Sequence, residues 1–228
     1  MTRKERVRWA TLIGVPFFAA MWVVVLGAMR WPRYWEWLAP EQTPMTWLES
    51  VMLVLCAGVA LLMAAVIYLR DQPAARLWLL LAAGFVWLAL DERFAVHERV
   101  RDGYLAPSGV SPIPWGAPGD FILILYGIAG LALLPQVLRL FRPDRLAFVL
   151  FGAGVLLAVV AVASDSIDIH AHSIDVERVE QTAEEIAELA SFTCFLLAMT
   201  LRLLAILTDG TVRLPRVGDV SQASMTGK

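Results

Sequence analysis

Hydrophobic residues are concentrated in six long apolar runs, which short polar segments separate. A helix needs about 20 largely apolar residues to cross the hydrocarbon core of a bilayer, and each run reaches about that length. The pattern therefore predicts an all-α, polytopic membrane helix bundle with about six transmembrane helices. The runs extend over residues 9–29, 46–69, 77–96, 121–141, 146–166 and 184–207.

Composition favours a single membrane domain with no separate soluble domain. Of the 228 residues, 59% are hydrophobic, and the mean hydropathy is +0.66, well above the values of soluble domains. We expect residues 1–208 to form one transmembrane domain and residues 209–228 a polar, disordered cytoplasmic tail. The first run follows a basic N-terminus, as in a signal peptide. It is too long for one and no small-residue cleavage site follows, which predicts a retained helix.

Basic residues are divided unequally between the two sets of loops that alternate along a six-helix chain. Counted together with the adjoining helix ends, the set formed by the N-terminus, the turns at 70–76 and 139–145 and the C-terminal tail holds thirteen of the nineteen Lys and Arg residues. By the positive-inside rule this set is cytoplasmic. Both termini are then inside and segments 97–120 and 166–183 outside. We expect a multi-pass cell-membrane protein, which in a bacterium would lie in the inner membrane.

The opposite, non-cytoplasmic set holds sixteen of the twenty-one acidic residues and all three histidines. Nothing in this charge pattern indicates a nucleic-acid partner. The acidic and imidazole side chains gather at the outer ends of the second, third, fifth and sixth predicted helices. Nine of them are candidate metal ligands: Glu49, Asp91, His97, Glu98, Asp165, Asp168, His172, Glu184 and Glu188.

Helical geometry, at about 100° per residue, places several candidates on shared helix faces. His97 points about 120° away from the Asp91 face of a regular helix. It can join a common site only if the helix end unwinds or bends. The predicted shared faces are Asp91 with Glu98, Asp165 and Asp168 with His172, and Glu184 with Glu188.

Carboxylates at these positions need a compensating charge. An isolated carboxylate inside a transmembrane segment costs about 2–3 kcal/mol even on lenient insertion scales. Several carboxylates close together also repel each other, so they must bind protons or another cation. We therefore expect one or two divalent metal ions. Sets rich in carboxylate with one or two histidines favour iron, manganese or zinc.

Purely structural interpretations compete at several positions. Glu49 follows Thr46 in a capping-box pattern, and Glu185 follows Thr182 in the same way, so both residues could serve as helix caps instead of ligands. Glu92 is interpreted as a surface charge or an arginine partner. The small-residue pattern around Gly154 indicates close helix packing.

The function predicted from these residues is that of a membrane metalloprotein. An enzyme of this kind would act on a lipid or another amphiphile, and we favour an oxidoreductase over a hydrolase because carboxylates outnumber imidazoles. One alternative is a cation- or proton-coupled transporter that uses the same carboxylates. Another is an accessory subunit of a membrane complex, and a homo-oligomer is compatible with either. The Glu-x-x-His motif of ferritin-like bundles and the HExxH motif are both absent.

Overall fold

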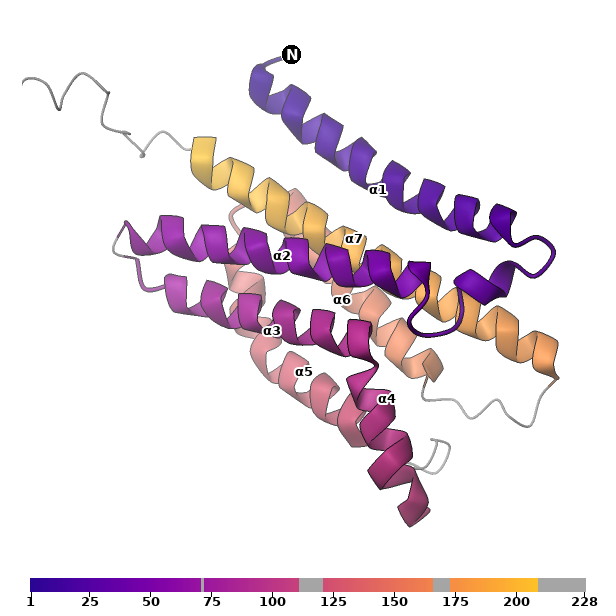
Figure 1. Cartoon of the computed structure of the whole chain (residues 1–228). Helices are drawn as coiled ribbons and strands as arrows, with labels where there is room; N and C mark the ends of the chain where they lie inside the picture. The colour runs from indigo at the N-terminus through magenta and orange to yellow at the C-terminus, as the bar shows by residue number, and fades with distance from the viewer. Residues whose placement is uncertain (71, 111–120, 166–172, 209–228) are drawn as a thin grey trace, which may run out of the picture.

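The computed structural model describes residues 1–70, 72–110, 121–165 and 173–208 (Figure 1). Every regular element in these ranges is a helix, which confirms the all-α prediction. The predicted tail at 209–228 lies outside them. Each of the six long helices overlaps one of the six apolar runs: α1 (Arg3–Met29), α2 (Pro44–Tyr68), α3 (Ala75–Phe94), α5 (Phe121–Phe141), α6 (Arg145–Asp165) and α7 (Ile174–Thr208).

Five of these helices are long and apolar enough to cross a membrane, which indicates a membrane protein. They are α1, α2, α5, α6 and α7. Helix α3 has the necessary length, 20 residues, but it is not one of the five. It carries Arg76 in its first turn and Asp91, Glu92 and Arg93 in its last turn.

Short helical elements follow α1 and α3. A 3₁₀ turn, η1 (Tyr34–Trp37), comes after α1. After α3 the chain forms α4 (Val96–Val100), the π-helical turn η2 (Arg101–Leu105) and the 3₁₀ turn η3 (Ala106–Ser108). The region after α3 is therefore helical but irregular.

Helix α2 lies at the centre of the bundle. It packs along α3 on one side and against α7 on another, and α6 packs along α7. Figure 1 shows α1 and α5 at opposite edges of this group. Residues of α2 that are completely buried recur every three to four positions, as in Leu53, Cys56, Ala60 and Met63. Helix α1 is peripheral, because its buried residues are only Ala19 and Leu26.

Close approach of α6 and α7 depends on Gly154. A Cβ atom at this position would lie 2.8 Å from the Phe195 ring and 3.1 Å from the Ser191 carbonyl oxygen. The Ser191 hydroxyl donates a hydrogen bond to the Gly154 carbonyl oxygen at 2.9 Å. Close helix packing, which the small-residue pattern predicted, is confirmed here.

Helix α7 extends well beyond the predicted segment 184–207. It has 35 residues and a length of about 52 Å at 1.5 Å per residue, more than the hydrocarbon core requires. Acidic residues in its first turn, Asp175 and Glu177, stabilise the positive end of the helix dipole. The Arg178 guanidinium carbon lies 4.1 Å from the centre of the Trp35 ring. These contacts explain why the helix begins at Ile174.

Candidate functional site

Three glutamate side chains from three different helices meet at one end of the bundle. Glu49 comes from α2, Glu92 from α3 and Glu185 from α7. One carboxylate oxygen from each lies within 4.8 Å of the others. We call these three residues the glutamate cluster. Among the predicted ligands whose side chains the structure describes, only Glu49 belongs to it.

Glu49 is directed into the bundle by the start of α2. Thr43 is the N-cap and its hydroxyl accepts a hydrogen bond from the Met45 amide, while Pro44 occupies the first turn. The Thr46 hydroxyl donates to the Thr43 carbonyl oxygen. The capping box expected from Thr46 is therefore wrong, since the helix begins earlier. Glu49 lies in the second turn and its side chain is fully buried.

Neither carboxylate oxygen of Glu49 has a hydrogen-bond partner among the described residues. Buried carboxylates in folded proteins are normally hydrogen-bonded or paired with a cation, because an isolated one is costly. No Lys or Arg forms an ion pair with any of the three glutamates in the part of the chain that the structure describes. Within the described residues, the three glutamates therefore lie together without a basic ion-pair partner.

Glu185 was expected to cap a helix after Thr182, and this prediction is wrong. Helix α7 begins at Ile174, so both residues lie in its interior. The Thr182 hydroxyl donates to the Arg178 carbonyl oxygen, four residues earlier. Glu185 is buried and faces α2, because its carboxylate contributes to the cluster with Glu49.

Glu92 was interpreted as a surface charge or an arginine partner, and the structure corrects this too. Its side chain is half-buried, and its Oε1 atom is buried without a hydrogen-bond partner. The neighbouring Asp91 faces a different set of groups. Because successive residues of a helix are rotated by about 100°, the adjacent acids Asp91 and Glu92 lie in two different environments.

Asp91 pairs with His97 across a break in the helix. Ala95 has left-handed backbone angles (φ 47°, ψ 49°) and separates α3 from α4. The break brings the His97 amide to 2.7 Å from Asp91 Oδ1, to which it donates, and His97 Nδ1 to 3.0 Å from Asp91 Oδ2. The bend that His97 required to reach Asp91 is therefore present. The same break removes the shared face expected for Asp91 and Glu98.

The remaining predicted ligands have different outcomes. Glu98 forms a 3.4 Å ion pair with Arg101. Glu188 is close enough to interact electrostatically with Glu49, Glu92 and Glu185, so it lies beside the cluster.

Glu184, adjacent to Glu185 in α7, is half-buried. Asp165 ends α6, and its side chain lies outside the described part of the structure. Asp168 and His172 lie outside the described residues as well.

Glu41 is a member of this acidic region that sequence reasoning missed. It lies between η1 and α2, outside the candidate membrane spans. Burial and the neighbouring carboxylates of Glu98 and Glu188 raise the pKa of Glu41 from its ordinary 4.5 to about 7. Its Oε2 atom is buried and has no hydrogen-bond partner among the described residues. Glu41 thus connects the surroundings of Asp91 and His97 with those of the glutamate cluster.

The geometry of the cluster fits a metal ion. Oxygen ligands lie about 2.0–2.6 Å from divalent cations, so two oxygens on opposite sides of one ion are about 4–5 Å apart. The three carboxylate oxygens lie within 4.8 Å of one another, close enough for all of them to contact one ion. Two ionised carboxylates within this distance repel each other by at least about 3 kcal/mol at an effective dielectric constant of about 20. A cation or bound protons must offset this repulsion.

The fold and the site define a helical membrane protein with a buried cluster of carboxylates. The chain belongs to a family described as a domain of unknown function, DUF8692, whose profile matches residues 7–203. No curated protein and no solved structure matches the chain significantly.

Proposed function

We propose that this protein is an integral membrane metalloprotein in which the glutamate cluster binds a divalent metal ion. The observation that supports the proposal best is the Glu49 carboxylate, which is fully buried and has no hydrogen-bond partner in the described structure. Two further carboxylates lie within 4.8 Å of it. A metal ion would satisfy all three groups at once and remove their mutual repulsion.

The proposed topology has six membrane-spanning helices, with α3 as the sixth. Helix α3 packs along α2, which is an apolar candidate span. Asp91 and Glu92 at its end lie against His97 and the other glutamates, so these two acids face protein groups and not lipid. The unequal distribution of Lys and Arg supports an orientation with both termini in the cytoplasm and the glutamate cluster near the non-cytoplasmic face.

The ligand types favour iron or manganese over zinc and copper. Three carboxylates supply hard oxygen donors, which suit manganese and oxygen-rich iron sites, whereas zinc and copper usually recruit nitrogen or sulfur. Glu188 and Glu41 are the nearest additional carboxylates, and the Asp91–His97 pair lies on the same side of the bundle. A bound metal would supply Lewis acidity or redox chemistry. An enzyme using it would act on a lipid or another amphiphile, which reaches a site at the end of membrane helices.

Metal analysis of detergent-purified protein tests the proposal. We expect wild-type protein to contain at least about one equivalent of iron or manganese, and Glu49→Gln to contain less than about one-tenth of that amount. The matched control is Asp175→Asn in α7, which removes the same charge from a side chain that is 85% exposed. The control should retain the wild-type metal content.

Thermal stability then separates a metal site from a network of protonated carboxylates. A metal that binds only the folded state at 100 times its Kd stabilises that state by about 2.7 kcal/mol. With metal bound, Glu49→Gln should therefore melt below the wild type. With excess chelator the order should reverse, because the substitution removes a buried carboxylate that lacks a counter-charge. A wild type without stoichiometric metal, whose melting temperature a chelator does not change, would refute the metal site. That result would favour proton binding and the transporter hypothesis.

A further inference from the structure

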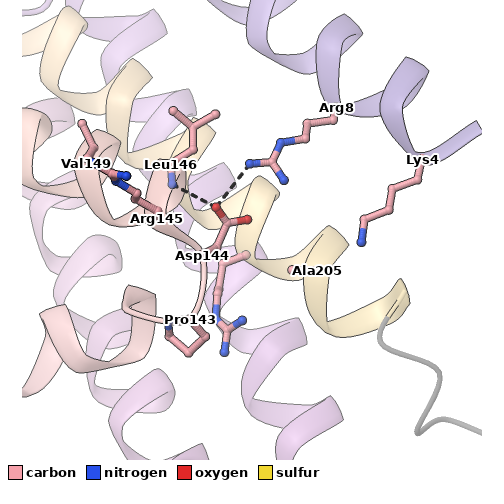
Figure 2. A pocket seen from close by; sticks show the side chains of 9 residues that line it. Lys4, Arg8, Pro143, Asp144, Arg145, Leu146, Val149 and Ala205 are labelled. Carbon is pink, nitrogen blue, oxygen red and sulfur yellow. Dashed lines mark hydrogen bonds and ion pairs between the residues drawn. The ribbon is translucent and has the colours of Figure 1, made fainter. Parts of the chain in front are cut away.

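A cavity of about 650 Å³ lies between the first turns of α1, the start of α6 and the end of α7. Four basic residues line it: Lys4, Arg8, Arg145 and Arg202, together with one acid, Asp144. Figure 2 shows Lys4 and Arg8 on α1, on the side toward Asp144 and Ala205. We call this the basic cavity.

Asp144 does not neutralise the basic cavity. It forms a 3.2 Å ion pair with Arg8, and the same oxygen accepts hydrogen bonds from the Leu146 and Ala147 amides at the start of α6. The negative charge of Asp144 is thus balanced by Arg8 and by backbone amides of the protein itself. Lys4 and Arg145 form no ion pair within the described residues. The cavity therefore retains a surplus of positive charge.

Apolar surface continues from the basic cavity. Val149 and Leu146 line it and are 55% and 37% exposed. The buried residues of α1, Ala19 and Leu26, lie in its second half, so no residue of its first half is buried. An occupant with an anionic group and a long apolar part would match both the charge and this exposed apolar surface.

The basic cavity is separate from the glutamate cluster. Ala205, which lines the cavity, follows Glu185 by 20 positions of the same helix, a distance of about 30 Å at 1.5 Å per residue. The two sites therefore lie at opposite ends of the bundle. An inference about the cavity does not depend on metal binding.

We propose that the basic cavity binds the phosphate headgroup of an anionic phospholipid, with the acyl chains lying along α1 and α6. Basic pockets between membrane helices on the cytoplasmic side recognise such headgroups. The positive-inside rule explains basic residues in loops but does not require them to converge. Here residues from three helices converge on one cavity, and apolar side chains continue from it.

Native mass spectrometry of the detergent-purified full chain, titrated with phosphatidylglycerol or phosphatidylcholine of the same chain length, tests this proposal. We expect the wild type to bind phosphatidylglycerol several-fold more tightly. Each basic residue near a headgroup contributes on the order of a fivefold affinity, so Lys4→Gln/Arg145→Gln should weaken phosphatidylglycerol binding at least about tenfold. Lys4 and Arg145 are exposed, so their loss should leave the melting temperature in lipid-free detergent nearly unchanged.

Two further double variants complete the experiment. Arg3→Gln/Arg6→Gln removes the same charge from α1 at residues that do not line the cavity, and it should weaken binding less than about threefold. Lys4→Arg/Arg145→Lys keeps the charges and should bind like the wild type. Equal losses in the two glutamine variants, or no preference over phosphatidylcholine, would overturn the proposal. So would inorganic phosphate that displaces the lipid at millimolar concentration, because the cavity would then be a site for small anions.

Discussion

Glu41 makes the stability of the folded protein depend on pH in a way that can be measured. Its pKa is about 7 in the folded protein against an ordinary 4.5, so between these values the folded state binds more protons than the unfolded state. The contribution of Glu41 to stability must therefore fall as pH rises from about 4.5 to about 7, by at most about 1.4 kcal/mol per pH unit. Glu41→Gln should reduce this slope, and it should gain stability over the wild type at pH 7.5.

Melting temperatures of both proteins between pH 4.5 and 7.5, in detergent with excess chelator, measure the effect. The difference between the two curves isolates Glu41 from the other carboxylates, which titrate in both proteins. Parallel curves would show that Glu41 has the same proton affinity in the folded and unfolded chains.

At the residue scale, the sequence predicted the acidic end of the molecule but not which acids meet there. Burial of carboxylates near helix ends was predictable from energetics, and Glu49 was identified in this way. Glu185 was assigned to a helix cap because it follows Thr182, and Glu92 to the surface or to an arginine partner. Each has a neighbour of the same charge, Asp91 or Glu184, one step along the helix. Which of two adjacent acids faces the interior of the bundle depends on how α3 or α7 is rotated about its own axis. Packing against α2 determines that rotation.

Helix–helix contact at Gly154 yields a stability prediction at the scale of elements. Gly154→Ala should destabilise the protein by about 1–3 kcal/mol, because the new methyl group would overlap the buried Phe195 ring and approach a backbone carbonyl. Gly152→Ala is the matched control, since its Cβ would meet nothing within 4 Å. The control should be neutral or stabilising by up to about 1 kcal/mol.

Unfolding of the purified variants in detergent by sodium dodecyl sulfate or by heat would measure both effects. If Gly154→Ala is as stable as the control, then α6 and α7 can move apart at this position without loss of folding free energy. Such a result would contradict the close packing described for this pair.

Element positions were predictable because long apolar runs determine membrane helices. The exceptions have local causes. The left-handed Ala95 makes α3 end at Phe94, two residues before the predicted 96, and the bonds from His97 to Asp91 hold that break. Helix α7 begins ten residues before the predicted 184, because acidic residues near the helix start and contact between Arg178 and Trp35 stabilise a polar extension. Hydropathy does not detect polar helices of this kind.

At the scale of the whole molecule, the proposed orientation predicts which surfaces water-soluble reagents can reach. Ser108 in η3 and Gln72 between α2 and α3 are both exposed and lie on opposite sides of the proposed membrane. A membrane-impermeant thiol reagent applied to intact cells should modify Ser108→Cys and leave Gln72→Cys unmodified. After permeabilisation it should modify both.

The native cysteines give a low background in this experiment, because Cys56 is buried and Cys194 is partly buried. Modification of Gln72→Cys alone in intact cells would invert the topology. It would also place the glutamate cluster near the cytoplasm.

The charged ends of α3 have a consequence for biogenesis. Ionised residues raise the free energy of transferring a lone segment from the translocon into lipid, so α3 is the long helix least able to leave the translocon alone. A short turn joins it to α2, the neighbour along which it packs. The two helices would therefore enter the bilayer together as a hairpin. Glu92 would then lie beside Glu49 before α7, which follows both helices in the chain, brings Glu185 to them, so the glutamate cluster is completed only after α7 has been synthesised.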